Sequence, residues 1–150
     1  MPTVLDLYDA LAAMPVLLDG QTVPVFDLDA LPASVQTAHL PCRLLLPLSA
    51  RGEARAVTPV SFAGAQTRIA WALTDLFLLL PAGQGRGLAE AAPALARYQS
   101  AYLDALRAHV PLLDGVTIES ATLDPGVFTY PEGGASYYGV EAALILTDIR

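Results

Sequence analysis

Apolar residues recur at two different spacings along the chain, and these spacings predict two helices and several strands. A short stripe at helical spacing follows Thr3, which together with Asp6 three residues later is typical of a helix N-cap. A longer stripe over residues 88–110 predicts the main helix. Pro93 fits only a first helical turn, so we expect regular helix to begin near Ala91.

Alternating apolar and polar positions predict strands in the remaining segments. The longest strand runs over residues 68–80 and would span about 40 Å at ~3.3 Å per residue, so we expect it to bend or to project as an arm. Another strand precedes it and is joined to it through residues 63–66, which makes a long hairpin. Shorter strands are expected over residues 42–48 and around Val25, where Pro24 indicates a sheet edge or a bulge.

The chain closes with two strands joined at Gly133-Gly134, and the second strand runs to the last residue. We expect this last strand to leave an uncovered edge, which would attract another chain. Together the elements predict one α+β domain over residues 1–150: an antiparallel or mixed β-sheet with a long hairpin, an N-terminal helix and a main helix packed on the sheet. A hairpin arm is expected to project around residues 50–80.

The composition adds a reason to expect self-association. Apolar residues make up 54% of the chain and charged residues only 15%, against about 45–50% and about 25% in ordinary globular domains. The surplus predicts apolar surface that is buried against other subunits; the alternative is a large core under an alanine-rich surface. The start of the chain lacks the features of a signal peptide, and the most apolar run is short and contains Asp75, so we expect neither a leader nor a membrane span.

The charge balance excludes one class of partner. The net charge is −7, and the eight basic residues are all arginine. A protein that grips nucleic acid needs a stripe of Lys and Arg along the phosphate backbone, which this chain does not offer. An acidic protein can still surround DNA, because like charges prevent sticking.

The sequence contains no recognisable catalytic or metal-binding pattern. Cys42 is the only cysteine, which excludes an intramolecular disulfide and a Cys-based zinc site within one chain. His39 and His109 have no partners at the spacing of a triad or of metal ligands. Asp27 and Asp29 could bind calcium or act as an acid–base pair, although a solvated turn is commoner for two such acids. We therefore expect no enzyme activity, no cofactor and no metal.

Several side chains are candidates for subunit contacts. Asp75 is an acid on an apolar strand and needs a charge partner if buried, for which we expect Arg55 or Arg68, within the chain or across a subunit contact. Arginine is enriched at interfaces, although ordinary charge balance explains the arginine cluster equally well. Two adjacent tyrosines face opposite sides of a strand, so one of them is left for a rim or partner. The candidates are Arg51, Arg55, Arg68, Asp75, Tyr137 and Tyr138.

Three stretches resemble small tail-terminator (tail-completion) proteins of long-tailed bacteriophages, and the order of the elements is similar as well. The stretch LPASVQTAHLPCRLLLPLS is like the proline-rich lead into an early strand of these proteins. The stretch LTDLFLLLPAGQGRGLAEA is like their strand-to-helix joint, and YYGVEAALILTD is like their closing strand. The resemblance spans most of the chain but contains no diagnostic signature, so it assigns no individual functional residue.

The resemblance implies a structural virion protein that forms a homohexameric ring, stops polymerisation of the tail tube and joins the tail to the neck of the head. The implied partners are other copies of the chain, the tail tube protein and neck or connector proteins, while DNA passes through the lumen without specific binding. The implied location is the tail–neck region of the virion, after synthesis in the host cytoplasm. A closed ring would also cover the edge of the last strand without producing an endless fibre.

The alternative is a small α+β module that binds an apolar ligand in a cavity between sheet and helix. Trp71, Phe77, Tyr98 and Tyr102 would line such a cavity. Aromatic residues at these spacings are also typical of an ordinary core. A monomer with a saturable ligand would favour the ligand-binding module, and a ring would favour the phage protein.

Overall fold

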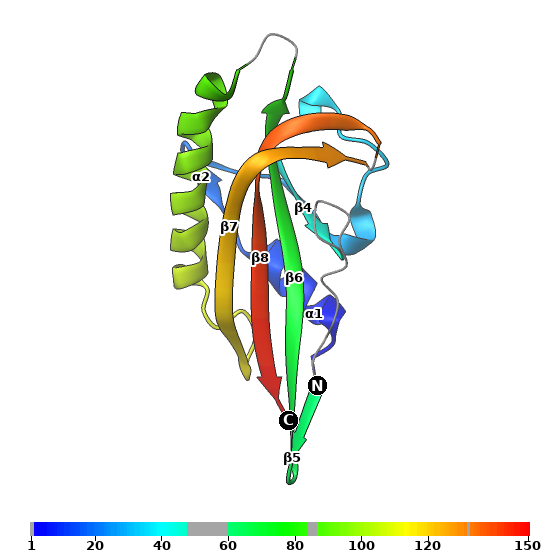
Figure 1. Ribbon diagram of the computed structural model, residues 1–150. Helices are drawn as coiled ribbons and strands as arrows, with labels where there is room; N and C mark the ends of the chain where they lie inside the picture. The colour runs from blue at the N-terminus through cyan, green and yellow to red at the C-terminus, as the bar shows by residue number, and fades with distance from the viewer. Residues whose placement is uncertain (1, 48–59, 84–86, 132) are drawn as a thin grey trace.

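The computed structural model of the chain describes residues 2–47, 60–83, 87–131 and 133–150, which form two helices and a curved mixed sheet (Figure 1). The predicted α+β class is confirmed. The elements follow the chain in this order: α1 (Val4–Ala13), β1 (Leu17–Leu18), β2 (Gln21–Thr22), β3 (Val25–Phe26), the 3-10 turns η1 (Leu28–Ala30) and η2 (Thr37–His39), β4 (Cys42–Leu46), β5 (Val60–Ala63), β6 (Gln66–Pro81), α2 (Leu88–Ala108), β7 (Val116–Tyr130) and β8 (Ala135–Ile149).

The main sheet has the strand order β3-β4-β6-β8-β7. β3 runs parallel to β4, and the other neighbouring strands are antiparallel. The short β3 lies at one edge, as Pro24 indicated. The long strand β6 pairs with three other strands. On one edge, β5 pairs with its first residues and β4 with its second half; on the other edge, β8 pairs with most of its length.

β8 lies inside the sheet rather than at its edge. It pairs with β6 on one side and with β7 on the other along nearly its whole length. The prediction that this strand leaves an uncovered edge is therefore wrong, because alternation along a strand defines its two faces but not the neighbours of its two edges. The outer edge of the sheet belongs instead to β7, where a bulge between Ile118 and Ser120 and the imino nitrogen of Pro125 interrupt a regular ladder.

Both helices begin where local chemistry favours them. The predicted N-cap of α1 is confirmed, because Thr3 Oγ1 accepts from the N–H of Asp6 at 3.2 Å and the carboxylate of Asp6 accepts from the N–H of Thr3 at 2.6 Å. α2 begins at Leu88, so the predicted start near Ala91 is wrong. Pro93 removes only one helical hydrogen bond, and burial of neighbouring residues against the sheet outweighs that loss.

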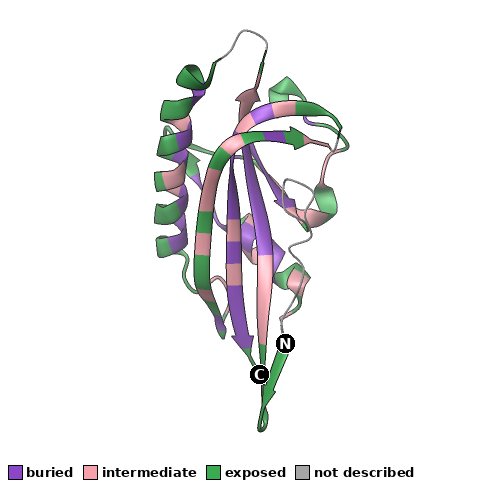
Figure 2. Ribbon diagram, viewed as in Figure 1, coloured by how far each residue is buried: buried purple, intermediate pink, exposed green. Residues whose placement is uncertain are grey.

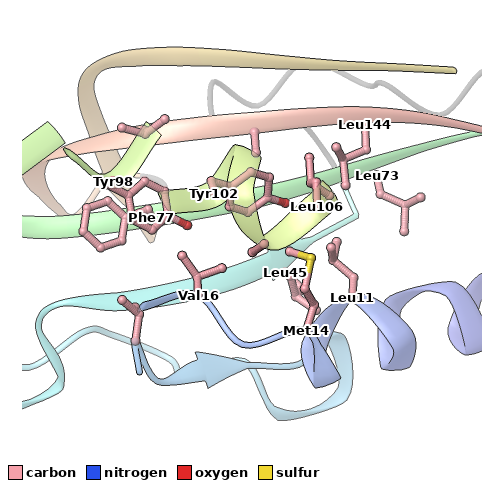
Figure 3. Packing of buried hydrophobic residues seen from close by; sticks show 14 of the residues in the cluster. Leu11, Met14, Val16, Leu45, Leu73, Phe77, Tyr98, Tyr102, Leu106 and Leu144 are labelled. Atoms are coloured by element: carbon pink, nitrogen blue, oxygen red, sulfur yellow. The ribbon is translucent and has the colours of Figure 1, made fainter. Parts of the chain in front are cut away.

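The sheet has a hydrophobic cluster on each face. α1 and α2 cover one face and pack there against residues such as Leu73, Phe77 and Leu144 (Figure 3). The other face carries a smaller cluster that includes Cys42, Leu76 and residues near the curled ends of β7 and β8. Burial is concentrated along the middle of β6 and β8, whereas the hairpin formed by β5 and the start of β6 is exposed (Figure 2).

Candidate functional site

An ion pair between Arg43 on β4 and Asp75 on β6 lies inside the domain. The Nη2 atom of Arg43 is 2.6 Å from Oδ2 of Asp75, and the two side chains are 1% and 0% exposed. The guanidinium also donates to the carbonyl oxygens of Met14 at 2.8 Å and Leu11 at 3.2 Å, at the end of α1. The hydroxyl of Tyr102 on α2 donates to Asp75 Oδ2 at 2.9 Å. The cluster therefore joins both helices to two strands.

The partner of Asp75 differs from the predicted one. A charge partner was expected for this acid and is present, but it is Arg43 and not Arg68, while Arg55 lies outside the described residues. The cause is the register: Leu45 lies opposite Asp75, so Arg43, two residues from Leu45, points to the same face of the sheet. No pattern in the sequence indicated that the arginine directly after Cys42 would point inward.

Burial and the charge of Asp75 shift the pKa values of Arg43, Tyr98 and Tyr102 in this cluster. Burial lowers the pKa of Arg43, but the adjacent carboxylate of Asp75 outweighs this effect and holds the pKa above its ordinary value. Burial, with a further contribution from Asp75, raises the pKa values of the Tyr98 and Tyr102 hydroxyls well above normal. Because all four groups are closed to solvent, the cluster is suited to holding the fold together and not to turning over a substrate.

The aromatic residues proposed to line a ligand cavity pack together in the core. Phe77 stacks on Tyr98 with ring centroids 3.7 Å apart, and Tyr98 lies 5.9 Å from Tyr102 (Figure 3). Trp71 is half-buried and packs against the same cluster. These four residues therefore contribute to the core and are not among the residues that line the groove described below.

The structure separates the predicted subunit-contact residues into three groups. Asp75 and Tyr137 are buried, and the hydroxyl of Tyr137 donates to the carbonyl oxygen of Val35 at 3.0 Å, so both are withdrawn as interface candidates. Arg68 is exposed and pairs with Glu119 on β7. Tyr138 is half-buried on the opposite face from Tyr137, as the strand alternation predicted. Arg51 and Arg55 lie outside the described residues.

A projecting hairpin forms the first candidate surface. We call residues 60–69 the arm; they comprise β5, a turn and the start of β6, and they extend past the chain termini at one end of the molecule (Figure 1). Val60 and Phe62 lie on the same face of the arm and are 47% and 78% exposed. Ile69, directly opposite Val60 in the register, adds to this apolar face. A hairpin with these exposed apolar side chains is typical of a protein-contact site.

A groove between α2 and β7 forms the second candidate surface. It has a volume of about 540 Å³ and lies where β7 curls over the sheet (Figure 1). Leu88 at the start of α2 and Val127 on β7 are 59% and 53% exposed at this groove. Its walls are almost entirely apolar and include Leu88, Ala92, Ala96, Gln99, Val127 and Tyr138. The groove is formed by segments that are far apart in the sequence. The pattern of apolar and polar residues along any one of them therefore could not predict it.

The remaining polar candidates take part in local structure. Asp27 caps η1 by accepting from the N–H of Leu28 at 2.6 Å, so the two-acid segment forms a turn. His39 accepts at Nδ1 from the N–H of Gln36 at 3.0 Å. Burial raises the pKa of the Cys42 thiol to about 11. Within the described ranges, no three His, Cys, Asp or Glu side chains are placed so that they could hold a metal ion together.

Comparison with known proteins adds no family assignment: the chain matches no protein-family model and has no significant match among curated proteins. In the part of the chain that the structure describes, neither helix has the length and apolar character needed to cross a membrane.

Proposed function

We propose that this protein is a structural component of a phage virion, a tail terminator that forms a ring on the tail tube and connects it to the head–tail neck. The observation that carries the proposal is the arm, which presents Val60 and Phe62 to solvent on a hairpin outside the main body of the domain. An exposed apolar hairpin is stabilised when another chain covers it. The resemblance in sequence implies a family that works through its surfaces, which is compatible with such a contact.

The position of the arm supports a ring in particular. The arm lies at one end of the molecule, and its contact with a different part of the next subunit would be heterologous. Heterologous contacts produce a closed ring when the rotation between subunits closes, and a filament when it does not. A net charge of −7 also suits a ring around DNA, because acidic groups at the lumen allow the DNA to pass without binding.

The interior of the domain favours a structural role. Arg43 and Asp75 compensate each other's charge and are closed to solvent, so this buried polar cluster offers no access for a substrate. The cluster connects both helices to β4 and β6, and the arm continues from β6. These features support a protein that contributes surfaces to an assembly.

The mass of the protein in solution tests this proposal. We expect light scattering across a concentration series to give a discrete mass near that of about six subunits, with rings in electron micrographs. Phe62→Ser should shift the mass towards the monomer, because it removes the apolar contact of the arm. Leu103→Ser is the matched control: Leu103 is 39% exposed on α2, outside the arm and the groove, and its substitution should leave the mass unchanged.

Two results would count against the ring. The first is a monomer at every concentration, with or without purified tail tubes as a template. The second is an equal loss of mass in Phe62→Ser and Leu103→Ser, which would mean that general surface hydrophobicity drives the association.

The groove favours a second candidate function, the binding of an apolar small molecule. Its volume of about 540 Å³ falls within the roughly 300–1,000 Å³ of ordinary ligand pockets. Native mass spectrometry of the purified monomer would detect a retained ligand, and Val127→Asp should abolish its binding by placing a charge in the groove. A monomer with a stoichiometric apolar ligand would favour this function over the ring.

A further inference from the structure

We propose that the arm of one subunit docks in the groove between α2 and β7 of the next subunit. This inference rests on the proposed ring and names the two surfaces that meet in it. The arm presents apolar side chains without cover from the described residues, and the groove presents an apolar hollow. Each copy of the chain therefore supplies one projecting surface and one receiving surface.

The arm and the groove fit in size and character. Val60 and Phe62 are two residues apart on β5 and point to the same side, so both enter one hollow together. A phenylalanine and a valine side chain fit within a groove of about 540 Å³. On the α2 wall, Ala92 and Ala96 have short side chains that allow a neighbouring backbone to approach closely. Docking would remove the exposed side chains of Leu88 and Val127 in the groove from solvent, and it would also remove those of the arm.

The charges of the described residues allow the arm to approach the groove. The arm contains no acid, and its one charged residue, Arg68, pairs with Glu119 of its own chain. Near the groove, Asp124 directly precedes Pro125 on β7, and Glu90 is exposed on α2 close to Leu88. In a chain of net charge −7, most pairs of surfaces repel each other. Contact between the arm and the groove therefore places a surface without acidic residues against a surface with acidic residues nearby, which avoids repulsion between like charges.

The positions of the two surfaces favour a contact that repeats from head to tail. The arm lies at the end of the molecule near the chain termini, whereas the groove lies towards the start of α2 (Figure 1). A contact between two such different surfaces is heterologous, and it ends in a ring when the rotation between subunits closes. A ring in which every arm is docked leaves neither surface free to recruit further copies.

Site-directed crosslinking tests the docking. The double variant Ala65→Cys/Ala96→Cys places one thiol at the turn of the arm and one in the groove and leaves Val60 and Phe62 intact. The native thiol does not interfere, because Cys42 is buried and burial raises its pKa to about 11. After light scattering has established the mass of the variant, a short bis-maleimide should produce a ladder of covalent oligomers that ends at the size of the ring.

The matched control is Ala65→Cys/Asp104→Cys, in which the second thiol is on an exposed part of α2 outside the groove. We expect at least tenfold less crosslinking in this control. A normal ring mass without a ladder would overturn the docking and leave the ring standing. Crosslinked dimers from Ala65→Cys alone would also overturn it, because arms would then meet arms. A stable monomer, or a small molecule retained in the groove of the assembled protein, would overturn it as well, and a monomer would overturn the ring too.

Discussion

The guanidinium of Arg43 and the carboxylate of Asp75 meet at 2.6 Å beneath the two helices, where neither side chain reaches solvent. A buried ion pair has a large desolvation cost, so its presence indicates that the surrounding groups satisfy both charges. Here the carbonyl oxygens of Met14 and Leu11 accept from the guanidinium, and the Tyr102 hydroxyl donates to the carboxylate. The pair thus connects α1, α2, β4 and β6.

Removal of one charge from this pair should destabilise the domain strongly. Asp75→Asn preserves the shape of the side chain and leaves the Arg43 guanidinium buried without a counter-charge. We expect the free energy of unfolding in urea to fall by about 3–5 kcal/mol. The double variant Arg43→Met/Asp75→Leu removes both charges and should lose less than Asp75→Asn. If Asp75→Asn loses less than about 1 kcal/mol, the pair does not have the role assigned to it.

The two buried tyrosines on α2 provide a matched comparison. The hydroxyl of Tyr102 binds Asp75, whereas the hydroxyl of Tyr98 is buried and has no hydrogen-bond partner in the part of the chain that the structure describes. Tyr102→Phe should therefore lower the free energy of unfolding by about 1–3 kcal/mol, and Tyr98→Phe should be neutral or stabilising. Urea denaturation of both variants measures the difference. Equal losses in the two variants would show that Tyr102 contributes through packing alone.

The sequence predicted the elements of the fold better than their arrangement. Alternation over residues 68–80 located the long strand of the hairpin, and the Thr3–Asp6 pair located the start of α1. The position of β8 between β6 and β7 could not be predicted, because an alternating pattern is the same for a central and an edge strand. α2 begins before the predicted start near Ala91, because packing of the helix against the sheet outweighs the local preference of Pro93.

Candidate sites were harder to predict for the same reason. The need of Asp75 for a partner follows from one residue and its neighbours, but the identity of that partner depends on the register between β4 and β6. The groove depends on the curl of β7 towards α2, which no local pattern encodes. Contacts between distant segments therefore determine the partner of Asp75 and the shape of the groove. The sequence alone shows only which side chains are present to form them.

Asp6 offers a test of pH dependence. Hydrogen bonds from the N–H and hydroxyl of Thr3 lower the pKa of this carboxylate below 3.8 in the folded protein. A lowered pKa stabilises the fold above the unfolded-state value, and this contribution is lost as the pH falls through the folded-state value. Asp6→Asn should therefore be less stable than the wild type near neutral pH, and the difference should shrink at about pH 3 and below. Urea midpoints at the two pH values measure the change; a constant difference would show that the charge is not responsible.

Asp9, one turn further along α1, should respond to the same substitution in the opposite direction. A hydrogen bond with Asp27 and the charges of Asp27 and Asp29 raise the pKa of this carboxyl group above 3.8. A raised pKa means that the stabilising contribution is present at low pH and is lost as the pH rises through the folded-state value. At neutral pH the ionised Asp9 therefore opposes folding, and Asp9→Asn should raise the urea midpoint there.

The gain should disappear at about pH 3 and below, where Asp9 is protonated in both the folded and the unfolded chain. Asp6→Asn provides the control for this variant, because it makes the same chemical change on an exposed position of the same helix and should lower the midpoint at neutral pH. Helix propensity alone would move both midpoints in one direction. Opposite shifts at neutral pH that converge in acid would show that the local charge environment of each carboxylate governs its contribution to stability.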